Sequence, residues 1–191
     1  MNGSQERLSP TDVLRHEHTV ILIVVEAMER EAATIRSGVP LDADAVAKMV
    51  EFTREFSDGC HHAKEEKVLF PTLLDSSPMA KGPVTVMLTE HDQGRAFVRA
   101  ITASLPAAAA GDEAAKAAVA DSLAGYADLL RRHIHKENEV LFPFAERALS
   151  ADDTARLAAE FTRIEEEETG AGVHEKYHAM AHELAAREER G

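Results

Sequence analysis

Two stretches of the chain carry the same arrangement of histidine, glutamate and apolar residues. Residues 60–71 read CHHAKEEKVLFP and residues 133–143 read HIHKENEVLFP. A shift of 72 residues aligns a His-x-x-x-Glu pair and the Leu-Phe-Pro that follows it in both copies. The two pairs are His61 with Glu65 and His133 with Glu137. Imidazole and carboxylate groups at this spacing are candidates for binding metal ions.

Each copy is preceded by a lone histidine. His18 lies upstream of the first pair and His91 upstream of the second, 73 residues apart, and a glutamate comes directly before each of them. The chain therefore consists of two related halves, each with one histidine followed by a His-x-x-x-Glu pair. Glu17 and Glu90 lie about 100° round the helix from their histidines, so we expect them to support ligands rather than bind metal.

The spacing of the pairs predicts that they converge inside the protein. Residues four apart on a helix lie about 6 Å from each other and project from the same face. Both pairs continue an apolar stripe, so they are expected to point inward. Burying such groups without partners costs several kcal/mol each, which a bound cation offsets.

The set of candidate ligands, four histidines and two glutamates, suggests two ions bridged by the two glutamates. If each half of the repeat supplies the histidines of one ion, His18 and His61 bind one ion, and His91 and His133 bind the other. This donor set suits iron, manganese or zinc. It has fewer carboxylates than the Glu-x-x-His di-iron bundles. Fewer anions favour ferrous iron, and hence the binding or reduction of small oxidants.

Helical periodicity accounts for most of the chain and predicts an all-α fold. The expected helices cover residues 10–36, 42 to the Pro71 region, 84–105 and 112–149, followed by one from about 150 and one over 173–189. Residues 75–83 and 106–111 are expected to be connections. We predict an antiparallel up-down four-helix bundle of two pseudo-symmetric hairpins with additional C-terminal helices. The predicted division is a flexible tail (1–9), the bundle (10–149) and a C-terminal extension (150–191).

Composition narrows the classes of partner. The 191 residues carry a formal charge of −13, and no cluster of Lys or Arg exceeds Arg131-Arg132. Nucleic acid and anionic membranes are therefore not expected as partners. The single cysteine, Cys60, excludes an internal disulfide. The beginning of the chain is polar and the apolar run 20–25 is too short to cross a bilayer, so we expect a cytoplasmic protein.

One further histidine has the spacing of a ligand but lacks a repeat counterpart. His62 and Glu66 share the spacing of the first pair, but Ile134 and Asn138 replace them in the second half. We therefore expect His62 and Glu66 to be exposed or to support the ligands.

The last expected helix carries His174, His178 and His182 at four-residue spacing, with Tyr177 beside them. This helix is expected to pack over the bundle with its histidines partly solvated. The alternative is that His178 or Tyr177 reaches the metal site.

The order of these motifs resembles the hemerythrin-like (HHE cation-binding) family over about residues 12–145. The resemblance implies a non-haem di-iron centre, oxo- or hydroxo-bridged, held by His18, His61, Glu65, His91, His133 and Glu137. Oxygen-carrying members have a second histidine where this chain has Arg95, and an aspartate where it has Glu137. The pattern is closer to the bacterial branch, which includes proteins linked to iron–sulfur cluster repair.

Three functions are compatible with this sequence. The first is a di-iron protein that binds or reduces O2, peroxide or nitric oxide in sensing, detoxification or stress response, with or without turnover. The second is an iron-handling protein that donates iron to damaged clusters. The third is a structural bundle without metal. The sequence predicts no oligomeric state.

Overall fold

The computed structural model describes residues 8–170 and 172–187, and this part of the chain contains helices and no strand. The fold is all-α, as predicted. Most of the expected flexible tail, residues 1–7, lies outside the described residues, and the division of the chain at residue 149 stays a prediction. No helix in the described part is long and apolar enough to cross a membrane.

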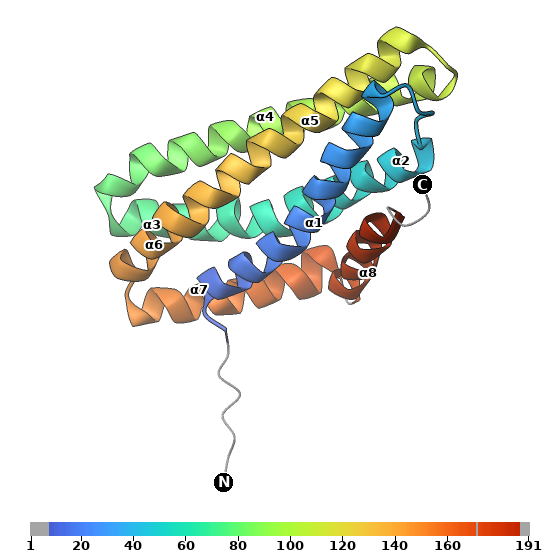
Figure 1. Cartoon of the computed structure of the whole chain (residues 1–191). Coiled ribbons are helices and arrows are strands. Elements are labelled where there is room, and N and C mark those ends of the chain that lie inside the picture. Colours follow the sequence, from blue (N-terminus) through green and yellow to red (C-terminus); the bar gives the residue numbers. More distant parts are fainter. Residues whose placement is uncertain (1–7, 171, 188–191) are drawn as a thin grey trace.

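Four long helical segments form the bundle (Figure 1). The first is α1 (Pro10–Arg36). The second runs without a break through α2 (Ala43–Phe52), η1 (Thr53–His62), η2 (Glu65–Leu69) and α3 (Phe70–Ser76). After a short turn, η3 (Pro78–Ala80), the third is α4 (Lys81–Ala109). The fourth contains α5 (Glu113–Lys136), η4 (Glu137–Leu141) and α6 (Phe142–Ala148). Within the bundle α5 packs against both α4 and α1.

Side-chain caps fix where the helices begin. Ser9 accepts a hydrogen bond from the backbone N–H of Asp12 and is followed by Pro10 at the first helical position. Asp42 and Asp112 cap α2 and α5 in the same way. Each cap satisfies a backbone donor that the first turn of a helix leaves without a partner, which is why these short polar residues set the boundaries.

The predicted end of the third helix is wrong by about one turn. The sequence predicts a loop over residues 106–111, but α4 continues through Pro106 to Ala109. Alanine has the highest helix propensity of any residue, so the alanines after Pro106 continue the helix. It ends where Gly111 adopts a positive φ of 97° and the Asp112 N–H bonds to the carbonyl of Ala107.

Short π-helical turns interrupt the second and fourth segments at matching places. In η2 the N–H of Phe70 donates to the carbonyl of Glu65, and in η4 the N–H of Phe142 donates to the carbonyl of Glu137. A proline follows each of these phenylalanines. Proline has no N–H, and its ring crowds the preceding turn, so the wider turn lets the helix continue past it. The sequence predicts that Pro71 kinks the end of its helix, and the helix continues past this proline to Ser76.

The core has two apolar clusters with a polar layer between them. One contains residues such as Ile21, Phe56 and Leu130. The other contains Leu14 and Leu141 among its members. In each of the four segments the predicted metal-binding residues lie, along the chain, between members of the two clusters. The apolar packing on both sides holds these polar side chains in place and separates them from water.

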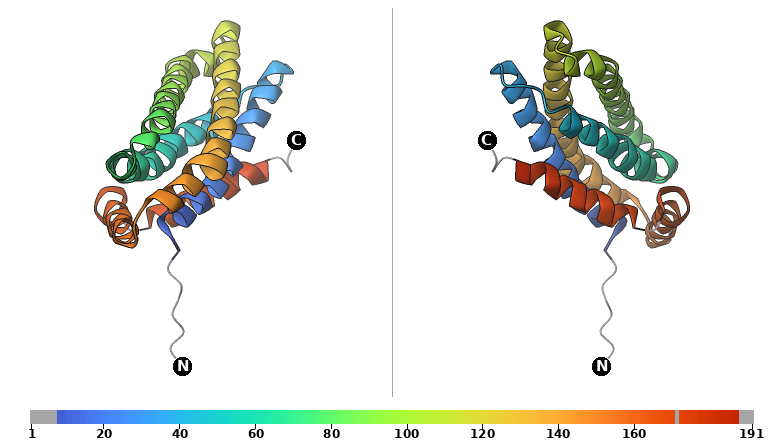
Figure 2. Two further views of the ribbon diagram at one scale, coloured as in Figure 1. Left: turned by 90° about the vertical axis from the view of Figure 1, so that its left-hand side faces the viewer. Right: turned by 90° about the vertical axis from the view of Figure 1, so that its right-hand side faces the viewer.

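The C-terminal helices lie along one side of the bundle (Figures 1 and 2). α7 (Ala151–Arg163) begins with a capping box in which Ser150 and Asp153 bond each other's backbone N–H groups. It continues as η5 (Ile164–Thr169), and α8 (Val173–Ala186) then packs against α1 and α2. The expected end of this helix at residue 189 lies outside the described residues.

Candidate metal centre

The six predicted metal-binding residues meet in the polar layer and are all at most 2% exposed. The four histidines form the two predicted pairs. The Nε2 atoms of His18 and His61 are 3.0 Å apart, and those of His91 and His133 are 3.1 Å apart. Each pair joins neighbouring helices, so the fold and not the local sequence brings its two nitrogens together.

Both glutamates lie between the two histidine pairs. One oxygen of Glu137 is 3.2 Å from Nε2 of His18, and its other oxygen is 3.3 Å from Nε2 of His133. The oxygens of Glu65 lie 3.7 Å from Nε2 of His61 and 3.5 Å from Nε2 of His91. Each carboxylate thus directs one oxygen to each pair, which is the arrangement that two bridging ligands require.

The carboxylates fit a bound cation. Within the described part of the chain, all four oxygens of Glu65 and Glu137 are buried and have no hydrogen-bond partner. Burial, together with the negative charge of Glu137, raises the pKa of Glu65 well above its usual value. Burial also acts to raise the pKa of Glu137, but the neighbouring His133 and His18 outweigh it and lower that pKa. A cation between the carboxylates satisfies these oxygens and removes their mutual repulsion.

Two further glutamates contact the rings of predicted ligands, in agreement with the supporting role that the sequence predicts. Glu17 accepts a hydrogen bond from Nδ1 of His61 at 2.9 Å, and Glu90 does so from Nδ1 of His133, also at 2.9 Å. Burial alone raises the pKa of Glu17, but the His61 hydrogen bond and the Lys64 charge lower it to about 2. An acceptor at Nδ1 leaves Nε2 directed at the metal position, and such partners fix the ring and raise its basicity.

A lysine forms an ion pair with each of these glutamates. Lys64 contacts Glu17, and Lys136 contacts Glu90 at the equivalent place in the repeat. Lys64 is fully buried and also binds Glu165 at 2.5 Å, whereas Lys136 is partly exposed. The ammonium group of Lys64 already supplies a positive charge beside Glu17. The nearby group of Glu17, Cys60 and His174 therefore needs no metal ion for neutralisation.

The two remaining predicted histidine ligands are held by residues on the opposite half. Nδ1 of His18 is 2.9 Å from the Asn138 side-chain oxygen, and Nδ1 of His91 is 2.7 Å from Glu66. Their rings stack on equivalent phenylalanines, with centroid separations of 5.5 Å for His18 on Phe142 and 5.9 Å for His91 on Phe70. Repetition of these contacts supports the predicted two-fold relation between the halves.

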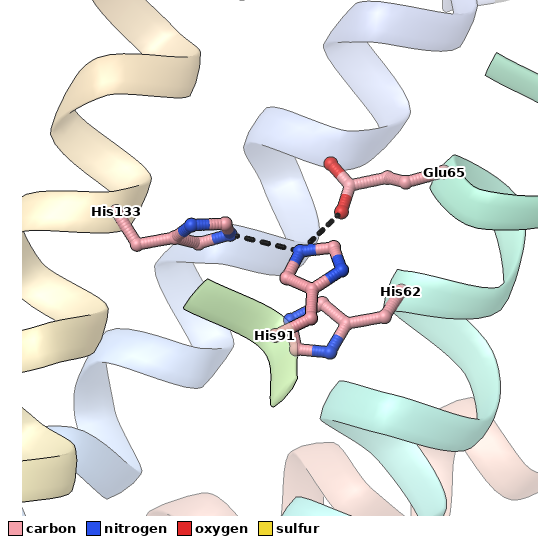
Figure 3. A group of neighbouring side chains, drawn as sticks. All are labelled: His62, Glu65, His91 and His133. Atoms are coloured by element: carbon pink, nitrogen blue, oxygen red, sulfur yellow. Dashed lines mark hydrogen bonds and ion pairs between the residues drawn. The ribbon is translucent and has the colours of Figure 1, made fainter. Parts of the chain in front are cut away.

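His62 is buried beside the candidate ligands, so of the two expectations for it, exposure and support of the ligands, exposure is wrong. It is 6% exposed, and its ring stacks on that of His91 with centroids 3.8 Å apart (Figure 3). One nitrogen of His62 lies within 4.8 Å of ligand atoms of Glu65, His91 and His133. The repeat was misleading here, because its other half has the apolar Ile134 at this position. Glu66 contacts Nδ1 of His91, a predicted ligand, as the supporting role requires.

The C-terminal helix does not contribute to either group of candidate ligands at the centre. The ring of His178 stacks on that of His16 at 5.8 Å. Tyr177 is buried against Phe52 and Phe56. The alternative in which His178 or Tyr177 reaches the metal site is therefore wrong for this structure, and α8 covers the bundle.

A cavity of about 220 Å³ borders the centre on the side of His62 and His91. Its other walls include Tyr126, Gly94 and Arg95. The tyrosine hydroxyl is buried, and no hydrogen-bond partner is found for it in the described part of the chain. This volume accommodates water, a diatomic molecule or a ring the size of imidazole, but no large substrate.

Comparison with known proteins agrees with this geometry. Residues 9–145 match the Hemerythrin HHE cation binding domain. The chain belongs to the hemerythrin family. No solved structure matches it.

Several relatives of this hemerythrin-like chain are known by sequence. It is 30% identical over 157 residues to the uncharacterized protein Rv1995 of Mycobacterium tuberculosis, covering 80% of this chain and 59% of that protein. It is also 30% identical over 142 residues to the iron-sulfur cluster repair protein YtfE of Cronobacter sakazakii, covering 72% and 61%. A probable iron-sulfur cluster repair protein of Haemophilus influenzae is 33% identical over 101 residues, covering 51% and 44%. The chain thus spans about three fifths of the length of the first two relatives.

Two features of this hemerythrin-like site could not be deduced from the repeat. His62 departs from the two-fold pattern, and its closeness to His91 depends on how the second and third segments pack. Asp58 and Arg95, which lie behind His62, also have no counterparts in the other half. The spacing of His62 and Glu66, which copies that of His61 and Glu65 one residue along, is the weak signal in the sequence that points to His62.

Proposed function

We propose that His18, His61, Glu65, His91, His133 and Glu137 hold two iron ions. The observation that supports this most strongly is the placement of the carboxylates, since each of the two glutamates directs one oxygen to each histidine pair. Iron in this position supplies redox chemistry and open coordination positions for a small ligand. The protein then positions the ions, excludes water through its two apolar layers and keeps the ligand rings oriented.

We propose further that the site binds or reduces a small oxidant such as O2, peroxide or nitric oxide. Two carboxylates among neutral imidazoles give less negative charge than carboxylate-rich centres, which favours the ferrous state that reacts with such molecules. The small cavity beside the centre supports a small ligand. This chemistry supports a role in sensing, detoxification or stress response, which we place in the cytoplasm as part of the proposal.

Ligand binding by the reduced protein tests this function. Anaerobically reduced, iron-loaded protein is mixed with O2, nitric oxide or peroxide and followed by absorption spectroscopy. We expect a spectral change that saturates with ligand, and loss of peroxide if the protein turns over. Glu65→Ala protein prepared in the same way is the control and is expected to show no change. An equal response from both proteins contradicts the proposal.

The second candidate is iron donation during repair of iron–sulfur clusters. The names of two relatives favour it, since an iron-sulfur cluster repair protein and a probable one are 30% and 33% identical to this chain. Incubating iron-loaded protein with an apo cluster protein, sulfide and reductant distinguishes the two functions. Rapid transfer of iron with reconstitution of the cluster favours donation, whereas iron that stays bound while small ligands react favours the first function.

A further inference from the structure

The C-terminal extension covers a face of the first half of the bundle, where α7 packs against α1 and η2 (Figure 1). Three apolar side chains of α7 and η5 are at most 3% exposed: Leu157, Phe161 and Ile164. They belong to the same apolar cluster as Leu14 and Val68. Glu165 follows them directly and binds Lys64 at 2.5 Å. One amphipathic helix thus covers this face with apolar residues at i, i+4 and i+7 and a carboxylate after them.

Five residues of the covered face are repeated unchanged in the second half of the chain. The first set contains Pro10, Val13, Glu17, Lys64 and Val68, and the second set contains Pro83, Val86, Glu90, Lys136 and Val140. The offset is 73 residues for the first three and 72 for the last two, as it is for the predicted histidine ligands on the same helices. The two-fold relation between the halves therefore places the two sets at equivalent positions. We refer to the second set as the open face.

The residues of the open face are much more exposed than their counterparts. Val68 is 8% exposed, whereas Val140 is 57% exposed. The side chain of Lys64 is fully buried, whereas that of Lys136 is 38% exposed. Val86 is 45% exposed as well. The sequence thus has the residue types of a covered face at a place that the described part of the chain leaves open to solvent.

The match between the halves ends beyond the open face, which limits the cover to one helix. In the first half, Tyr177 of α8 packs on Phe56 with ring centroids 6.0 Å apart. The repeat has Asp128 at the position of Phe56, and the side chain of this aspartate is 69% exposed. Arg132 likewise replaces the buried Cys60. The second half therefore has an equivalent of the surface under α7, but none of the apolar surface under α8.

The charges around the open face favour an acidic partner over a second copy of the chain. A hollow at its edge is lined by Arg131, Arg132, His135 and Lys136. Among the described residues Lys136 forms an ion pair with Glu90 only, whereas Lys64 binds both Glu17 and Glu165. A carboxylate of a partner can therefore bind Lys136 as Glu165 binds Lys64. Two copies joined through this face bring their basic clusters together, which is unfavourable.

We propose that the open face binds one helix of a partner protein. This helix has the pattern of α7 and η5, with apolar residues at i, i+4 and i+7 and a glutamate directly after the last of them. Binding of an amphipathic helix through such apolar anchors is a common mode of recognition between proteins. The proposal goes beyond the proposed function and does not depend on it, because none of the five residues of the open face is a predicted metal ligand.

A peptide copied from this chain serves as the probe. Residues 150–167 contain α7 and the first residues of η5. The labelled peptide is titrated with the full chain and followed by fluorescence anisotropy. We expect saturable binding that is about tenfold weaker or more for Val140→Asp protein, because this change places a charge where the helix buries a valine. Val39→Asp, at a valine that is 51% exposed in the connection between α1 and α2, is the matched control and is expected to bind like wild-type protein.

The ion pair with Lys136 is tested by a pair of substitutions, one in each molecule. Peptide with Glu165→Gln is expected to bind wild-type protein about fivefold more weakly than the unchanged peptide. Lys136→Met protein is expected to bind both peptides equally. This coupling locates the peptide on the open face, which loss of binding in one variant does not do. Circular dichroism confirms that the variants are folded.

Three results overturn the proposal. The first is absence of peptide binding to folded wild-type protein. The second is equal binding to wild-type and Val140→Asp protein, since the peptide then binds elsewhere, for example in exchange for α7. The third is a dimer of the full chain, detected by sedimentation, that Val140→Asp abolishes and Val39→Asp does not, because a second copy then occupies the open face.

Discussion

At the scale of single residues, the position of the glutamates between the two histidine pairs distinguishes them from the histidines. Glu65 approaches one histidine of each pair, whereas His18 belongs to one pair only. We expect Glu65→Ala to lose both metal ions and His18→Ala mainly to weaken one. Metal analysis after gel filtration measures this directly. Glu65→Ala protein that retains two ions at normal affinity refutes the bridging assignment.

The two supporting lysines offer a matched pair of substitutions. Lys64 is fully buried with Glu17, whereas Lys136 beside Glu90 is 38% exposed. Removing one partner of a buried ion pair costs about 3–5 kcal/mol, whereas an exposed pair contributes about 1 kcal/mol or less. We therefore expect Lys64→Met to lower the free energy of unfolding far more than Lys136→Met. Urea denaturation of both metal-free variants measures the difference, and equal losses contradict the role of Lys64.

At the scale of elements, the caps and turns explain why much of the fold was predictable. Ser9 with Pro10, Asp42 and Ser150 are local signals, and the helices begin where these residues indicate. The duplicated His-x-x-x-Glu pairs likewise predicted which side chains converge. Local rules did not predict the π-helical turns at Glu65 and Glu137, or the continuation of α4 past Pro106. These depend on how a long helix accommodates proline within a packed bundle.

The helix α7 provides a prediction about capping. Ser150 and Asp153 satisfy two backbone N–H groups at its start. Ser150→Ala removes one of these bonds and is expected to lower the free energy of unfolding by about 1 kcal/mol. Thermal and urea unfolding measure the loss. Ser76→Ala, at a serine whose hydroxyl bonds a carbonyl within its own helix, is the control and is expected to have a smaller effect.

At the scale of the whole molecule, the polar layer couples metal binding to stability. Without metal, the carboxylates of Glu65 and Glu137 are buried together and without hydrogen-bond partners in the described part of the chain. Bound ions stabilise the folded state by mass action, by about 2.7 kcal/mol at a ligand concentration 100 times the Kd.

A conservative change at Glu65 separates the stability of the metal-free protein from the stabilisation that bound metal adds. Glu65→Gln replaces a buried acid, whose pKa is raised well above its usual value, by a neutral group of the same shape, so the metal-free variant is expected to be at least as stable as metal-free wild-type protein. Addition of Fe²⁺ is expected to raise the melting temperature of the wild-type protein but to have little effect on the variant. Calorimetry with and without Fe²⁺ measures the stability of the metal-free proteins and the rise in melting temperature on metal addition. A variant that is destabilised without metal and still responds fully to Fe²⁺ contradicts this coupling.

The iron content of the folded chain tests the central claim most directly. Protein reconstituted anaerobically with Fe²⁺ and freed of unbound metal is analysed for iron per chain. Two carboxylates that each face both histidine pairs predict close to two iron ions per chain. A single ion, or none, under conditions in which the protein is folded contradicts the account.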